Sequence, residues 1–129
     1  MDFALIKLKN KANRRPVQIQ KSTINFGPLL SLGFPNGVPL KGNSGSFIKD
    51  NLTTAFTNMF APIGSSGSPI FSEENGKLQG IIISSIYNHE MNQEDNCIRE
   101  TIDNTFKPMT LYNKMSAIHD KIVKFVIQN

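Results

Sequence analysis

The stretch GSSGSPIF at residues 64–71 places a serine between glycines and leads directly into an apolar run. A polar turn at residues 73–76, ending in the Asn-Gly pair that hairpins favour, separates this run from LQGIIISSI at residues 78–86. The β-branched run at residues 81–83 is typical of a buried strand. These residues predict a glycine-rich turn followed by a β-hairpin, with strands over 69–71 and 78–86.

Short apolar runs bounded by turn residues continue on both sides of this hairpin. Pro35-Asn36-Gly37 is a strong turn signal, and residues 87–105 are polar enough to predict a surface loop. Further strands are expected at residues 3–8, 17–19, 28–34, 45–48, 52–60 and near Phe106. Such spacing indicates a mostly β protein, built as a barrel or sandwich.

The C-terminal part changes to a helical period. From about Thr110 the apolar residues recur every three to four positions. They are Leu111, Met115, Ile118, Ile122, Val123 and Val126. This pattern predicts one amphipathic helix over about residues 110–127.

Composition limits the function classes. A chain of 129 residues with 39% hydrophobic content suits one domain with its own core. The lone Cys97 excludes an internal disulfide and a cysteine-based zinc site. The first residues lack the basic head and cleavage site of a signal peptide, and no run is apolar enough for a membrane span, so no membrane partner is expected.

The net charge of +4 is concentrated near the N-terminus. Its cations are Lys7, Lys9, Lys11, Arg14 and Arg15. A nucleic-acid surface usually interleaves such cations with aromatic residues, which this segment lacks. A solvated strand edge that discourages aggregation is the favoured interpretation, and we do not expect a nucleic-acid partner.

The turn at residues 64–69 has the chemistry that acyl transfer needs. Glycines let a backbone bend tightly and approach a ligand closely. The turn can therefore present the hydroxyl of Ser66 together with a cluster of backbone N–H groups. Nucleophilic acyl transfer requires a positioned oxygen and donors directed at the developing oxyanion.

Three motifs resemble one protein family. GSSGSP at residues 64–69 has the G-x-S-G-x-P form of the chymotrypsin-like serine proteases, in the manner of bacterial glutamyl endopeptidases and related trypsin-like peptidases. DFALIKL at residues 2–8 looks like the strand that carries their triad aspartate, and GFPNG at residues 33–37 resembles their G-x-P-x-G turn. The resemblance covers most of the chain. It implies the C-terminal six-stranded antiparallel β-barrel of a trypsin-like double barrel, with a C-terminal α-helix.

The resemblance also implies an activity and its residues. The chain would belong to a serine endopeptidase that hydrolyses peptide bonds of a polypeptide substrate through an acyl-enzyme, without metal or cofactor. Ser66 would be the nucleophile, the backbone N–H groups of Gly64 and Ser66 the oxyanion hole, and Asp2 the residue that orients the histidine. GNSGS at residues 42–46 is a second serine motif, but Phe47 stands where proline belongs, so Ser66 is preferred.

The chain departs from the family in its histidine. The family order is His, Asp, Ser, whereas only Met1 precedes Asp2. His89 and His119 follow Ser66 and are expected at the surface. We therefore expect residues 1–129 to be part of a protease domain, truncated at its N-terminus and lacking the N-terminal barrel. Its parts would be an aspartate strand at 2–8, a barrel at about 27–108 and a helix at about 110–127. Alone it would be inactive and poorly soluble.

The specificity pocket can also be placed by the resemblance. Its expected lining is Phe60, Ala61, Ile63, Ile82, Ser84 and Ser85. No charge lies among these residues, and Ile82 stands where glutamyl endopeptidases place a histidine. A small or medium apolar side chain is the expected preference, since an apolar pocket does not satisfy a buried charge.

Two other classes of function stay open. One is a catalytically inactive trypsin-fold binding module that has kept the Ser66 loop and lost the base. The other is a small basic β domain that binds nucleic acid through its N-terminal cations. Localisation is left open by the sequence.

Overall fold

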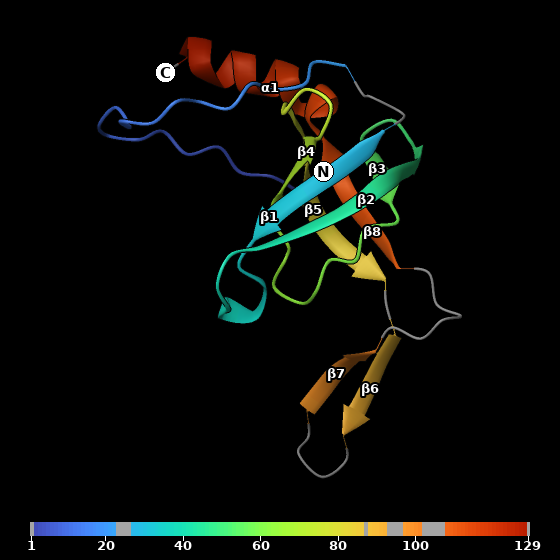
Figure 1. The fold of residues 1–129 in the computed structure, drawn as a ribbon. Coiled ribbons are helices and arrows are strands. Elements are labelled where there is room, and N and C mark those ends of the chain that lie inside the picture. Colours follow the sequence, from blue (N-terminus) through green and yellow to red (C-terminus); the bar gives the residue numbers. More distant parts are fainter. Residues whose placement is uncertain (1, 23–26, 87, 93–96, 102–107, 129) are drawn as a thin grey trace.

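The computed structural model describes residues 2–22, 27–86, 88–92, 97–101 and 108–128. Its main body is a closed barrel of six antiparallel strands in the order β1-β2-β3-β8-β5-β4, closed by the pairing of β1 with β4 (Figure 1). The barrel strands are β1 (Pro28–Gly33), β2 (Lys41–Asp50), β3 (Thr54–Thr57), β4 (Pro69–Ser72), β5 (Leu78–Ile86) and β8 (Met109–Lys114). The helix α1 (Met115–Gln128) follows β8 directly. The predicted mostly β fold, with a six-stranded antiparallel barrel and a C-terminal helix, is confirmed.

Apolar side chains from alternate strand residues fill the interior of the barrel. Every second residue of a strand points inward, so Leu29 of β1, Ile70 of β4 and Tyr112 of β8 are fully buried. They form the core with Ala55, Met59, Ala61 and Ile82, against which Phe47 packs. The hairpin predicted across residues 73–76 is present as β4 and β5. The predicted Pro35-Asn36-Gly37 turn is the short 3-10 helix η1 (Pro35–Gly37).

The start of the helix was predicted too early. Residues 109–114 are strand β8, and α1 begins at Met115. The four-residue spacing from Leu111 to Met115 fits a helix, but the alternate burial of Thr110 and Tyr112 is that of a strand. β8 pairs with both β3 and β5 and so links these two strands of the barrel. The barrel strands therefore extend to Lys114 rather than to residue 108.

Two other predictions of local structure were wrong. Residues 2–8 form no strand, because they take part in no ladder with the strands of the described chain. Part of the predicted loop at 87–105 is a two-stranded sheet of β6 (Asn88–Asn92) and β7 (Cys97–Thr101). Its few apolar residues gave no strand signal. The predicted strand at 17–19 is reduced to one bridge between Ile19 and Leu78, and Phe106 lies outside the described residues.

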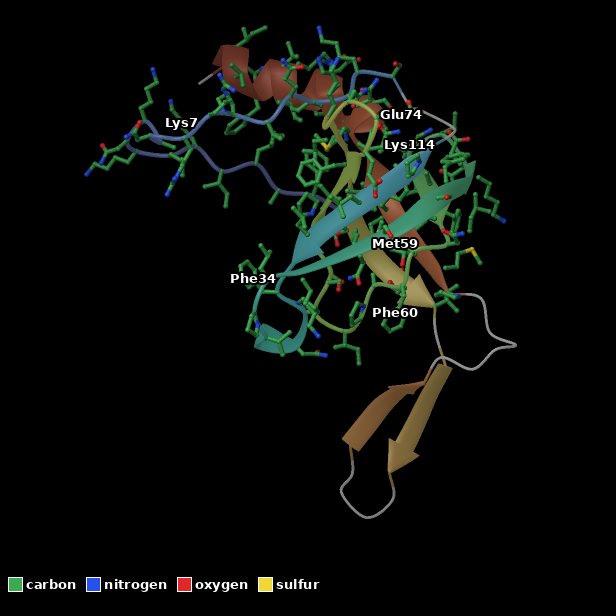
Figure 2. All side chains as sticks on the ribbon, viewed as in Figure 1. Lys7, Phe34, Met59, Phe60, Glu74 and Lys114 are labelled. Carbon is green, nitrogen blue, oxygen red and sulfur yellow. The ribbon has the colours of Figure 1, made fainter. Side chains whose placement is uncertain are left out.

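The N-terminal segment runs outside the barrel. It passes alongside α1 and extends away from the strands (Figure 1), and Lys7 lies on this outlying part (Figure 2). Every residue from Ile6 to Gln18 is exposed. The side chains of this part of the chain therefore lie at the surface and add nothing to the barrel core.

Candidate functional site

The loop that carries Ser66 is fastened to strand β5. The N–H of Gly67 donates to the carbonyl of Ile82 at 2.8 Å, and the N–H of Ile82 donates to the carbonyl of Ser68 at 3.0 Å. Gly64 and Gly67 have φ angles of 85° and 84°, in the left-handed region that favours glycine. The two glycines thus allow the pair of tight turns that brings Ser66 to the surface beside β5.

Ser66 lies against a β-bulge. Ile82 of β5 pairs with Tyr112 of β8 and Ser84 pairs with Leu111, so Ile83 has no partner in the β5–β8 ladder. The hydroxyl of Ser66, on an exposed residue, donates to the carbonyl of Ile83 at 2.9 Å. Bulges of this kind re-aim groups beside functional sites. Here the bulge supplies an acceptor that holds the Ser66 hydroxyl in one orientation.

The backbone amides of the loop divide into used and unused groups. Ser65 N–H donates to the carbonyl of Pro62 at 3.0 Å, and Ser68 N–H donates to that of Ser65 at 2.9 Å. Gly67 N–H is taken by β5. Within the described residues the amides of Gly64 and Ser66 have no acceptor. The two amides predicted to form the oxyanion hole are therefore those that the loop leaves available to a ligand oxygen.

The turn η1 packs against the loop that carries Ser66, through contacts of Asn36 with Ile63 and Gly64. The N–H of Asn36 donates to the carbonyl of Ile63 at 3.2 Å, and Asn36 itself has a positive φ of 53°. A β-carbon on Gly64 would lie 2.8 Å from the amide nitrogen of Asn36. The sequence marked Asn36 only as part of a turn; its contact with the Ser66 loop follows from the tertiary packing.

The backbone of Asp2 is held to strand β8. The side-chain amide of buried Asn113, in β8, donates to the main-chain carbonyl of Asp2. Asn113 pairs with Ile81, two residues before Ile83 on β5. The Asp2 residue is exposed, and among the described residues its carboxylate has no partner. The structure thus fastens the Asp2 backbone to β8, and no hydrogen bond joins Asp2 to Ser66 among the described residues.

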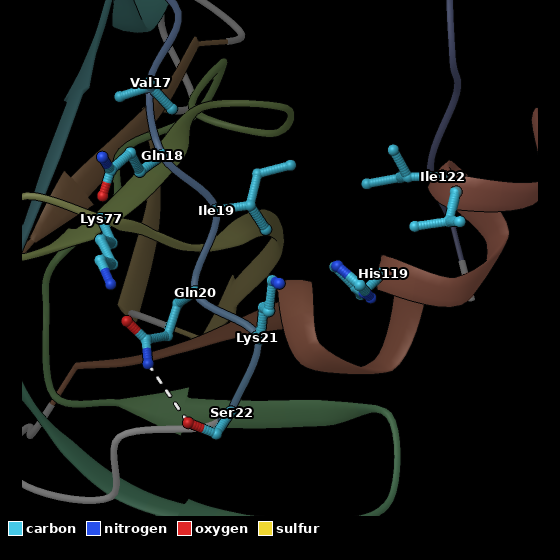
Figure 3. A pocket seen from close by; sticks show the side chains of 10 residues that line it. Val17, Gln18, Ile19, Gln20, Lys21, Ser22, Lys77, His119 and Ile122 are labelled. Carbon is cyan, nitrogen blue, oxygen red and sulfur yellow. Dashed lines mark hydrogen bonds between the residues drawn. The ribbon is translucent and has the colours of Figure 1, made fainter. Parts of the chain in front are cut away.

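The one histidine whose side chain the structure describes, His119, lies elsewhere. His119 lies on α1, where its Nδ1 is 3.4 Å from Asp120 and its side chain faces residues 17–22 (Figure 3). His89 lies in β6, and its side chain is outside the described part of the structure. Among the described side chains, no histidine bonds to Ser66.

The predicted pocket residues have different environments. Ala61 and Ile82 belong to the barrel core, and Phe60 is half-buried. Ile63 and Ser84 are exposed. The Oγ of Ser85 lies 3.0 Å from Oγ1 of Thr110, which donates to the carbonyl of Met59. Ile63 and Ser84 are thus the predicted pocket residues most open to a ligand.

The second serine motif is part of the barrel wall. Ser44 lies within β2, in register with Leu30 of β1. A β-carbon on Gly45 would lie 2.7 Å from the backbone nitrogen of Met59. This segment is an ordinary paired strand and presents no serine at a glycine turn.

The described residues form neither a metal-binding cluster nor a membrane-spanning helix. They contain no cluster of three or more His, Cys, Asp or Glu side chains that could hold a metal ion. They also contain no helix long and apolar enough to cross a membrane. Comparison of the chain with protein-family profiles and with curated proteins found no match.

Proposed function

We propose that this chain carries the nucleophile and oxyanion hole of a trypsin-like serine endopeptidase. The observation that carries the proposal is the division of the amides in the Ser66 loop. Ser65, Gly67 and Ser68 use their N–H groups to hold the turn, while those of Gly64 and Ser66 have no acceptor among the described residues. Free donors beside an exposed hydroxyl are the arrangement that acyl transfer requires.

The proposed reaction starts at the Ser66 hydroxyl. Ser66 Oγ attacks the carbonyl carbon of a peptide bond, and the amides of Gly64 and Ser66 stabilise the resulting oxyanion. The amine leaves, and water then hydrolyses the acyl group on Ser66. Loss of one oxyanion donor costs such enzymes about 100- to 1,000-fold in rate. The expected apolar pocket, to which Ile63 and Ser84 would contribute, selects the residue before the cleaved bond.

The proposal needs a general base that the described side chains do not supply at Ser66. In the structure the Ser66 proton is directed at the Ile83 carbonyl, which is an acceptor but not a base of useful strength. An imidazole is required to take this proton and give it to the leaving amine. Asp2 would orient that imidazole: its carboxylate is open to a partner, and Asn113 of β8 holds its backbone.

The N-terminal segment supports the need for a further part. Ile6 is 82% exposed and Leu8 is 64% exposed, in an extended segment without a strand partner among the described residues. Exposed aliphatic side chains of this kind are stabilised when another part of the protein buries them. The proposed partner is an N-terminal barrel of the same protease domain, which would also supply the histidine.

A non-catalytic binding module is the second candidate. The hydrogen bond from Ser66 to Ile83 favours it, since this bond occupies the hydroxyl in a resting orientation. In this candidate the loop would serve only to connect η1 with β4. The two candidates differ in whether Ser66 reacts.

Peptide cleavage tests the proposal. The longest natural form of the chain is incubated with internally quenched peptides that have small or medium apolar residues in their centre. Ser66→Ala should abolish cleavage, and Ser44→Ala, in the β2 serine motif, should leave it unchanged. Cleavage that survives in Ser66→Ala would refute the assigned nucleophile, and a folded protein that cleaves none of the peptides would favour the binding module.

A further inference from the structure

A groove of about 570 Å³ lies between residues 17–22 and helix α1 (Figure 3), and Ser66 is not among the residues that line it. This volume is within the range of about 300–1,000 Å³ typical of ligand sites. Ile19 forms one wall, and Ile122 and Val123 form the other. Figure 3 shows the side chain of Ile19 directed towards Ile122. The groove therefore offers an apolar slot between an extended segment and a helix.

One end of the groove is cationic. Lys21 and Lys77 both line the groove, and neither has an ion-pair partner among the described residues. Figure 3 shows Lys21 at the end near His119, and Lys77 on the other side of residues 17–22. Lys21 lies opposite His119 in Figure 3. The acidic neighbour of His119 is Asp120, which is not among the lining residues and has a side chain 93% exposed. The charge at this end is thus suited to an anionic group from a ligand.

The extended segment also has a free hydrogen-bonding edge. Gln20 N–H donates to the carbonyl of Leu78 at 2.9 Å, and Leu78 N–H donates to that of Gln18 at 2.8 Å. Successive residues of an extended chain direct their backbone groups to opposite edges, so those of Ile19 point away from Leu78. Within the described chain the N–H and C=O of Ile19 have no partner.

We propose that this groove binds the C-terminal end of an extended peptide. The peptide would pair with the free edge at Ile19, place an aliphatic side chain between Ile19 and Ile122, and set its terminal carboxylate against Lys21. Strand addition of this kind takes affinity from backbone hydrogen bonds and specificity from side-chain pockets. A backbone edge favours a peptide over a fatty acid, which has no amide groups to pair. The inference does not depend on Ser66.

The test uses a fluorescein-labelled hexapeptide, Gly-Ser-Thr-Val-Ser-Val, with a free C-terminal carboxylate, and the same peptide as its C-terminal amide. Binding to the full chain is followed by fluorescence polarisation. The free acid should bind at least about tenfold more tightly than the amide, because a hydrogen bond to a charged group is lost. Lys21→Met should remove this difference, and Lys9→Met, at an exposed lysine outside the groove, should keep it.

The apolar wall is tested in the same assay. Ile122→Ser should weaken both peptides, and Ile127→Ser, at an exposed isoleucine of α1 that does not line the groove, should weaken neither. Equal binding of acid and amide, or of Lys21→Met and the unchanged chain, would overturn the proposal. Absence of saturable binding to a folded chain would overturn it as well.

Displacement of the peptide by decanoate but not by unlabelled peptide would identify an aliphatic carboxylate ligand instead. Because Ser66→Ala should bind the peptide normally, failure here is separable from failure of the protease proposal.

Discussion

Gly64 packs so closely on Asn36 that a β-carbon at residue 64 would lie 2.8 Å from the Asn36 amide nitrogen. Both residues have positive φ, and the Asn36 amide also donates to the carbonyl of Ile63. Two turns, whose residues Asn36 and Gly64 lie 28 positions apart in the chain, thus fix each other. The amide of Gly64 has no acceptor among the described residues, whereas the amides of Ser65 and Ser68 hold the turn.

Gly64→Ala should destabilise the protein more than Gly67→Ala. Both glycines have φ near +85°, but an added β-carbon meets Asn36 at residue 64 and nothing within 4 Å at residue 67. Left-handed strain is common to both, at about 1–3 kcal/mol, so the difference between the variants reports the clash. Urea unfolding measures it. Equal midpoints for the two variants would contradict the packing of η1 against the loop.

Leu29→Ala should cost about 2–5 kcal/mol of unfolding free energy, because Leu29 is fully buried in the barrel core and its loss leaves a cavity. The matched variant Leu52→Ala removes the same atoms from a residue that is 93% exposed. Its unfolding free energy should change by less than about 0.5 kcal/mol. Urea denaturation of both variants measures the two changes. Similar losses of unfolding free energy would contradict the burial of Leu29 and the exposure of Leu52.

Tyr112 should make the fold sensitive to alkali. Burial, with a smaller effect of the Asp50 charge, raises the pKa of Tyr112 well above its ordinary value. The native state thus keeps the phenol neutral, while the unfolded chain ionises it above about pH 10. This contribution to stability is complete below that pH and is lost as the pH rises further.

The comparison with Tyr112→Phe isolates this effect from the titration of lysines. At pH 8 the variant should be about as stable as the parent, since the buried hydroxyl has no partner among the described residues. From pH 10 to 11.5 the parent should lose more stability than the variant, as measured by urea midpoints. Parallel losses in the two proteins would show that the Tyr112 phenol is not buried as described.

Lys114→Met should destabilise the junction between β8 and α1. The nearly buried ammonium of Lys114 lies 2.9 Å from the Asp50 carboxylate and also donates to the carbonyl of Asn51. Loss of hydrogen bonds to a charged group predicts a cost of about 1–3 kcal/mol. Lys124→Met, at an exposed position of α1, is the control. Thermal unfolding that does not distinguish the two variants would argue against a structural role for Lys114.

Local patterns predicted the hairpin of β4 and β5 well. Its Asn-Gly turn and β-branched strand are signals that depend on neighbouring residues alone. The strand β8 was missed because Leu111 fits both a helical and a strand period, and only its pairing with β3 and β5 decides between them. Residues 3–8 have a strand pattern but join no ladder of the described sheets, and a strand forms only where a second strand bonds to it.

The candidate site was predictable only in part. Ser66, Gly64 and Asp2 were found through motifs, which record residue types at fixed spacings. The acceptor at Ile83 and the support from Asn36 have no sequence signal, because both depend on which segments the barrel brings together. The Asn113 amide that holds the Asp2 backbone lies 111 positions away in the chain, so it could not be inferred from local pattern.

Reaction of Ser66 with a fluorophosphonate probe tests the central claim most directly. The longest natural form of the chain is labelled beside its Ser66→Ala and Ser44→Ala variants, and the modified peptide is located by mass spectrometry. We predict one label per molecule on Ser66, retained in Ser44→Ala and lost in Ser66→Ala. A well-folded protein whose Ser66 stays unlabelled would contradict the protease account and leave the loop with a purely structural role.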